Sequence, residues 1–226
     1  MNRVLGIVRT HLADRWSWII FPWLILSISF VTNLIIVKLI GDSIYSGGLA
    51  SIYIYMMVIG ILSVAQTFPF IIGFSVRRRD YFLGTTTTIT VISALSAIVI
   101  CLLGYIERKT DYWGVKLHFF NIEYLTDGPV LERLWILFVL MIHLFFLGFT
   151  ISCIHRRFGR NGLFFFFIVL AIAFTISVYL ITSYHKWNAI FDWFGDISVI
   201  ELSSGLFICT LIYVGVSYLL LRRATV

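Results

Sequence analysis

Polar side chains within the long apolar runs of this sequence are the first candidates for chemistry. Three stand out: His143 lies near the middle of one run, and the amides Asn33 and Gln66 lie in two others. A histidine inside an apolar helix can hold a proton or line the path of a substrate. It can equally form an interhelical hydrogen bond that fixes packing. Asn33 and Gln66 are the amides available in other runs, so we expect one of them to be its partner.

Sets of residues that would support catalysis or metal binding are missing from the sequence. It contains no HExxH, no G-x-S-x-G and no pair of aspartates within the apolar runs. It also has no G-x-x-x-x-G-K-S/T loop, so any energy from ATP must come from a partner. We therefore predict no catalytic residue, no metal site and no cofactor bound by this chain. The histidines are dispersed, at positions His11, His118, His143, His155 and His185.

A short charged stretch, residues 75–85, interrupts two long apolar runs. Its three consecutive arginines cannot stay in hydrocarbon, since each costs about 3 kcal/mol at the centre of a bilayer. One interpretation is an anchor that only sets topology. The other is a docking element for a cytoplasmic partner, because exposed rings next to arginines are typical of interface cores. The residues concerned are Arg77, Arg78, Arg79, Asp80, Tyr81 and Phe82.

The composition indicates an integral membrane protein. Of the 226 residues, 60% are hydrophobic and only 12% are charged, with a mean hydropathy of +0.99. Soluble domains carry about a quarter charged residues. The net charge of +6 comes from short clusters at the ends of apolar runs, which is a membrane pattern and predicts no nucleic-acid partner. The three cysteines are separated along the chain and are interpreted as apolar packing residues.

The expected fold is all-α, a single domain over residues 1–226 with six transmembrane helices. Residues 1–15 alternate apolar groups with cations at a helical spacing, which predicts an amphipathic helix in the membrane interface. Each later apolar run is about long enough to cross the hydrocarbon core. The predicted spans are residues 16–40, 51–74, 84–105, 133–154, 162–182 and 203–221.

The distribution of basic residues predicts the topology. With both termini in the cytoplasm, eleven of the 17 basic side chains lie on the inner face. The long polar segment 106–132 is then an extracytoplasmic loop. Residues 185–202 are too polar to span and too aromatic for an ordinary loop, with Trp187, Phe191, Trp193 and Phe194 as their aromatic members.

This arrangement resembles the permease subunits of ABC transporters of the ABC-2 type, also called type V exporters. The resemblance covers most of the chain as an order of elements, and locally it rests on residues 74–85, Phe-Ser-Val-Arg-Arg-Arg-Asp-Tyr-Phe-Leu-Gly-Thr. In small bacterial members of this family, serine or threonine, basic residues, an aromatic pair and a small residue often stand at that place.

The resemblance implies a function and a set of partners. Residues 76–84, with Arg77 to Phe82, would form the coupling helix seated in a separate ABC ATPase subunit, which binds ATP and Mg²⁺. Residues 185–202 would be a re-entrant segment that closes the exit path. A second permease subunit, identical or related, would pair with this one in the cell membrane. The implied activity is export of an amphipathic cargo, such as an antimicrobial peptide, a drug or a lipid-like molecule, and hence antimicrobial peptide resistance.

Two other functions remain open at the level of sequence. A membrane scaffold or sensor subunit could use the same arginine stretch to dock a signalling partner without moving any solute. An intramembrane enzyme centred on His143 would need a second catalytic group, which the sequence does not offer.

Overall fold

The computed structural model describes residues 3–121 and 128–224. The fold is all-α, as predicted. Within the described ranges, five helical stretches are long and apolar enough to cross a membrane: Trp16–Ile40, Gly47–Gly73, Arg78–Lys109, Val130–Ser183 and Val199–Arg222.

The elements follow one another with few irregular connections. A single turn of π-helix opens the first long stretch, and another interrupts the second. The second one directly precedes α4, where the missing backbone donor of Pro69 predicts a kink. Two short strands pair in parallel, with Ile44 opposite Leu117. In chain order the elements are α1 (Arg3–Ala13), η1 (Trp16–Ile20), α2 (Phe21–Ile40), β1 (Ile44–Tyr45), η2 (Gly47–Leu49), α3 (Ala50–Leu62), η3 (Ser63–Thr67), α4 (Phe68–Gly73), α5 (Arg78–Lys109), η4 (Tyr112–Gly114), β2 (Leu117–His118), α7 (Val130–Ser183), α8 (Trp187–Asp196) and α9 (Val199–Arg222).

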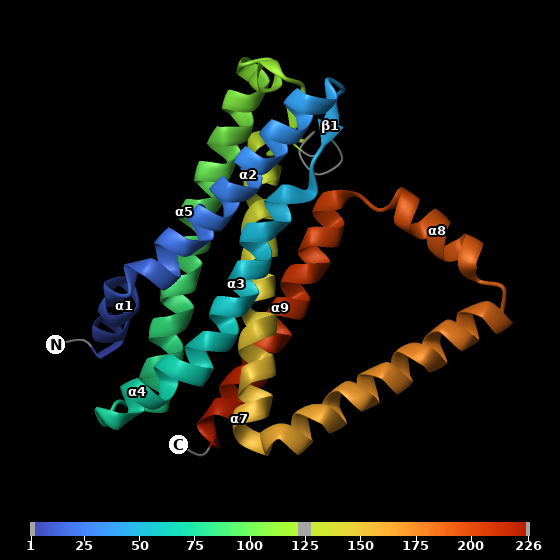
Figure 1. Ribbon diagram of the computed structural model, residues 1–226. Coiled ribbons are helices and arrows are strands. Elements are labelled where there is room, and N and C mark those ends of the chain that lie inside the picture. Colours follow the sequence, from blue (N-terminus) through green and yellow to red (C-terminus); the bar gives the residue numbers. More distant parts are fainter. Residues whose placement is uncertain (1–2, 122–127, 225–226) are drawn as a thin grey trace.

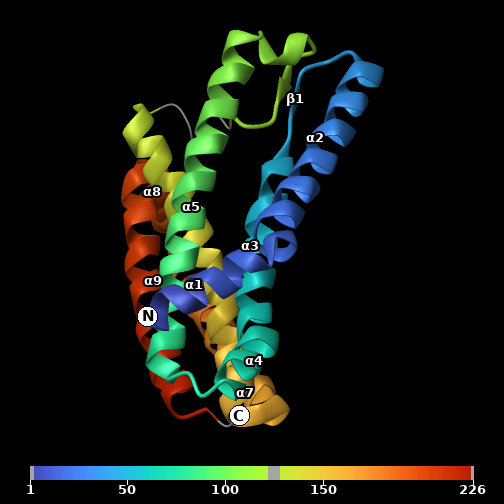
Figure 2. The same ribbon diagram turned by 90° about the vertical axis from the view of Figure 1, so that its left-hand side faces the viewer.

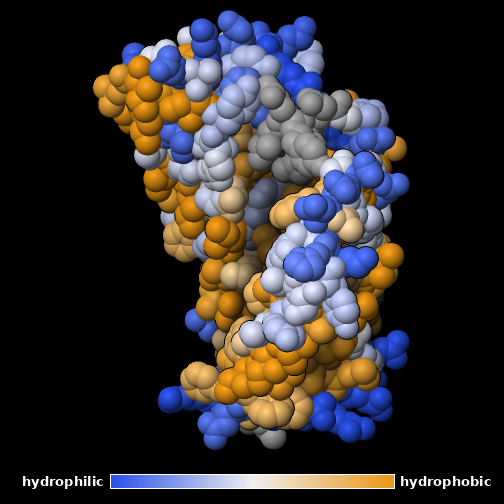
Figure 3. All heavy atoms as spheres, turned by 90° about the vertical axis from the view of Figure 1, so that its right-hand side faces the viewer, coloured by the Kyte–Doolittle hydropathy of each residue, from blue (hydrophilic) through white to orange (hydrophobic). Residues whose placement is uncertain are grey.

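The long helices form a bundle with two different ends (Figures 1 and 2). At one end, here called the arginine end, α4, the start of α5 and the last turn of α9 meet the middle of α7. The opposite end, here called the loop end, holds the β1–β2 pair and the turn after α5. Figure 3 shows hydrophilic residues at both ends and also at mid-height on this side, with hydrophobic residues over much of the remaining surface between the ends. Long hydrophobic surfaces between polar ends suit a membrane-embedded protein.

The core of the bundle lies where α3 and α5 pack against the first half of α7. Phe145, Phe146 and Phe149 project from α7 and are almost completely buried, as are Ile52 and Met56 of α3. A helix that is apolar all round can bury one side in the bundle and leave the other for lipid. Many large apolar side chains accordingly stay exposed on the outside.

The predicted spans 133–154 and 162–182 lie in the two helical parts of α7, which meet at a kink at Gly159. The backbone turns at Gly159, with φ 69° and ψ −171°, a conformation that is essentially restricted to glycine. Figure 1 shows the part after Gly159 leaving the bundle obliquely, so that it joins α9 only through α8. This outer arm, residues 160–183, is strongly apolar and almost entirely exposed.

Candidate functional site

Basic residues from distant parts of the sequence gather at the arginine end. Arg78 donates a hydrogen bond to the backbone carbonyl of Arg222 at 2.9 Å, which ties the start of α5 to the end of α9. The guanidinium of Arg156 in α7 lies 5.6 Å from the ring centre of Phe68. Three of the basic clusters that the sequence places on one face, around Arg78, Arg156 and Arg222, therefore share one end of the bundle. Arg77 and Arg79 are exposed there.

The aromatic pair Tyr81 and Phe82 does not belong to this exposed surface, and the expectation of exposed rings was wrong. Tyr81 is 0% and Phe82 6% exposed. The Tyr81 hydroxyl donates to the carbonyl of Ser63 at 2.7 Å, and Phe82 packs against Phe149 and Tyr218. The cause is that residues 76–84 form no separate short helix. Because α5 runs without interruption from Arg78, its first turn carries both rings into the bundle.

The predicted N-terminal amphipathic helix forms as α1, and its apolar face packs on α5. Ile7 is buried and contacts Gly84, where a side chain would overlap it. His11 is buried beside Trp18 and Tyr81, and its Nε2 lies 2.9 Å from the Thr85 hydroxyl. Burial lowers the pKa of His11 to about 4, although the nearby Asp14 carboxylate partly opposes this shift. His11 is therefore neutral while α1 is docked.

Acidification should release α1 from α5. Because the docked histidine has the lower pKa, the undocked state binds more protons between pH 6.5 and 4, and docking weakens as the pH falls through this window. At pH 5 the loss should be about 2 kcal/mol. Hydrogen exchange of the α1 amides, corrected for the intrinsic effect of pH, measures this. His11→Gln should remove the pH dependence, and equal protection at pH 7 and pH 5 in the unmodified protein would contradict the assignment.

The intramembrane polar candidates Asn33, Gln66 and His143 are not brought together. Asn33 donates to the carbonyl of Ser29 at 2.8 Å and accepts from the Ser46 hydroxyl at 2.8 Å, so its amide is satisfied locally near the loop end. Gln66 is exposed in the π-helical turn η3. Neither is the partner of His143, so that expectation was wrong.

His143 instead bridges two helices. Its Nδ1 lies 3.0 Å from the Thr210 hydroxyl of α9, and its ring packs on Tyr213. One heptad further on, Thr150 and Ser217 form a second bridge at 2.8 Å. Both bridges join α7 to α9 at the same sequence separation, which is the pattern of two parallel helices. The sequence signal was the spacing of seven shared by both pairs, and it supports the packing interpretation of His143.

The aromatic segment 185–202 contains the short helix α8 and the first residues of α9. Figure 1 shows α8 standing away from the bundle, between the outer arm and α9. Trp187, Phe191, Trp193 and Phe194 are all exposed, so the expectation that this segment folds back into the bundle was wrong for a single chain. The next helix begins with a capping box, in which the backbone N–H of Ser198 donates to the Glu201 carboxylate and that of Glu201 to the Ser198 hydroxyl.

A buried carboxylate organises the loop end, and no motif in the sequence indicated it. Glu107 is completely buried near the end of α5. Its Oε2 accepts from the indole of Trp113 and from the backbone N–H groups of Phe119 and Phe120, at 3.1, 3.2 and 2.8 Å. Its Oε1 accepts from the backbone N–H and the amide of Asn121, at 3.0 and 3.1 Å. The chain after α5 is thereby wrapped around a single side chain.

This arrangement also corrects the bounds of the predicted loop 106–132. Its first residues belong to α5, which extends to Lys109, and its last belong to α7, which begins at Val130. Residues 122–127 of the predicted loop lie outside the described residues.

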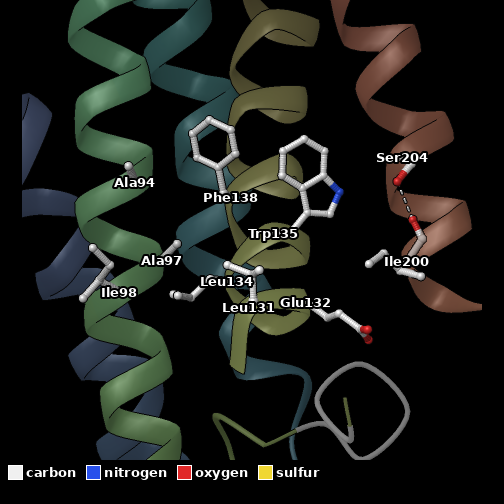
Figure 4. A pocket seen from close by; sticks show the side chains of 10 residues that line it. All are labelled: Ala94, Ala97, Ile98, Leu131, Glu132, Leu134, Trp135, Phe138, Ile200 and Ser204. Carbon is white, nitrogen blue, oxygen red and sulfur yellow. Dashed lines mark hydrogen bonds between the residues drawn. The ribbon is translucent and has the colours of Figure 1, made fainter. Parts of the chain in front are cut away.

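An apolar cavity of about 850 Å³ lies between α5, α7 and α9, on the side of the loop end. Two small residues of α5, Ala94 and Ala97, leave the room for it, and the large rings of Trp135 and Phe138 form part of its wall (Figure 4). Glu132 is the one charged residue among the described lining residues. The complete lining is Ala94, Ala97, Ile98, Leu131, Glu132, Leu134, Trp135, Phe138, Ile200 and Ser204.

Among the described residues, no three His, Cys, Asp or Glu side chains lie close enough together to hold a metal ion. The cavity, the exposed arginines and the unpacked outer arm are the features on which a functional proposal can rest.

No family model matches the sequence, and comparisons with curated proteins and with solved structures find no match.

Proposed function

We propose that this chain is the membrane-spanning permease subunit of an ATP-driven ABC transporter, which exports an amphipathic cargo. The observation that carries the proposal is the open cavity of about 850 Å³ lined by three apolar helices. Its volume falls in the range of about 300–1,000 Å³ that is typical of sites for drug-sized ligands. Its largely apolar lining favours a lipid-like or amphipathic molecule over a small ion.

In the proposed topology the chain crosses the membrane six times, with the arginine end and both termini in the cytoplasm. The turn at Gly159 supports this count, because it divides α7 into two parts that each exceed the roughly 20 residues needed for a crossing. The basic residues gathered at the arginine end support the orientation.

Two kinds of partner follow from this proposal. The exposed Arg77 and Arg79 offer charge to a separate ATPase subunit that binds ATP and Mg²⁺. Tyr81 and Phe82 are buried against other helices and so would not contact the ATPase directly. They would instead transmit the movement of the ATPase into the bundle. A second permease subunit, identical or related, would cover the outer arm and α8, whose apolar faces contact little else in this chain.

Purification of the chain from its native cells in mild detergent tests the proposal. We expect a stoichiometric P-loop ATPase in the eluate by mass spectrometry, with measurable ATP hydrolysis. The charge reversals Arg77→Glu and Arg79→Glu together should reduce the recovery of this ATPase at least tenfold, since both side chains are exposed and the fold does not depend on them.

Lys109→Glu is the matched control, because it reverses an exposed charge at the loop end and should leave the ATPase bound. If the variant with both arginines reversed still binds the ATPase undiminished, the stretch around Arg77 and Arg79 has no coupling role. If folded protein brings down no ATPase at all, the transporter proposal fails and a scaffold or sensor subunit becomes the better assignment.

A further inference from the structure

The cavity between α5, α7 and α9 carries one unpaired charge. Glu132 lies in the first turn of α7, and Figure 4 shows its carboxylate on the α9 side of the cavity. The side chain is partly buried, and within residues 3–121 and 128–224 it forms no hydrogen bond or ion pair. The dipole of α7 favours an acid in this turn but supplies no counter-charge to the cavity. A carboxylate partly withdrawn from water beside apolar walls is stabilised by a cationic partner.

The indole of Trp135 provides a second attraction for a cation. Trp135 follows Glu132 by three residues on α7, so both side chains project from the same helix face, and both line the cavity. A carboxylate combined with an aromatic face is the combination that recognises ammonium and quaternary ammonium groups. The remaining lining residues are apolar except Ser204, whose hydroxyl already donates to the carbonyl of Ile200, so these walls suit a hydrocarbon chain.

We propose that this cavity binds a single-chain cationic amphiphile, with its cationic group between Glu132 and Trp135 and its alkyl chain against α5. A diacyl phospholipid is the less suitable occupant. Its phosphate would stand beside the Glu132 carboxylate, and none of the described lining residues is cationic. The inference deepens the proposed function, since it gives the charge and the shape of the cargo.

Binding is measured on the permease alone, so its outcome is independent of the ATPase. The full chain is placed in lipid nanodiscs at pH 8, and saturation binding of radiolabelled dodecyltrimethylammonium is recorded. The competitors are dodecyldimethylamine oxide, of similar shape but no net charge, and dodecylphosphocholine, which adds a phosphate. We expect saturable binding of the cation, with both competitors at least several-fold weaker.

Three variants locate the site. Glu132→Gln should weaken binding of the cation about tenfold and leave that of the amine oxide unchanged, because only the charge is removed. Trp135→Leu should weaken binding of the cation several-fold. Ala94→Phe fills the space beside α5 and should reduce binding of both probes. Asp111→Asn removes an exposed charge outside the cavity and should change neither.

Each contrary result overturns the inference. Unchanged cation affinity in the Glu132→Gln protein would exclude the carboxylate, and dodecylphosphocholine binding as tightly as the cation would identify a phospholipid site. Unaltered binding in the Ala94→Phe protein would place the probe elsewhere. Size-exclusion profiles and thermal midpoints confirm that each variant is folded. If an ATPase co-purifies but the permease does not bind the cation, the transporter proposal stands. Only the assignment of a cationic amphiphile as its cargo is then refuted.

Discussion

Replacement of Glu107 by alanine is expected to detach the chain after α5 from the loop end and to lower the free energy of unfolding by at least about 3 kcal/mol. The substitution deprives the backbone N–H groups of Phe119, Phe120 and Asn121 of their common acceptor. A buried donor left without a partner costs about 1–3 kcal/mol. Unfolding in detergent mixtures and protease cleavage within residues 110–121 measure the two consequences.

Glu107→Gln should fall close to the alanine variant despite its similar shape. An amide replaces one acceptor oxygen by an NH₂ group, which then faces donors such as the indole of Trp113 or the amide of Asn121. Asp111→Asn serves as the control, because Asp111 is exposed at the same end. Protease resistance of residues 110–121 that survives Glu107→Ala would show that the carboxylate does not hold this segment.

Alanine at Gly60 or Gly148 is expected to separate α3 from α7 and to cost about 3 kcal/mol or more. At Gly60 an added methyl would overlap the carbonyl oxygen of Phe145, with the backbone nitrogen of Phe149 at 2.9 Å. At Gly148 it would overlap the carbonyl oxygen of Met57. Small residues allow helix backbones to approach closely in membranes, and backbone cannot move aside as a side chain can.

The free energy of unfolding in detergent mixtures measures this effect too. Gly215→Ala in α9 is the matched control, since an added methyl there meets nothing within 4 Å and should be neutral or slightly stabilising. The double variant at Gly60 and Gly148 should cost less than the sum of the single variants, because either one already separates the same two helices. A Gly60→Ala protein within about 0.5 kcal/mol of the parent would contradict the close approach.

The amino-acid sequence by itself determined that this is a helical protein of the membrane. Hydropathy over windows of about 20 residues and the period of an amphipathic helix are local properties, so the long apolar helices and α1 were predictable without any contact. The same is true of the clusters of basic residues at the ends of the apolar runs. The irregular turn before α4 was likewise indicated by Pro69 alone.

Only the tertiary structure decided which side chains are available for function. Arg79 and Tyr81 are two residues apart, yet one is exposed and the other buried, because a helix turns about 100° per residue and only Tyr81 meets the rings of α1 and α4. Glu107 gained its donors from residues up to 14 positions away, and His143 met Thr210 from 67 positions away. The cavity likewise has walls from three helices. Pairings of this kind depend on which helix faces meet, and that is settled by packing between distant segments, which local patterns do not contain.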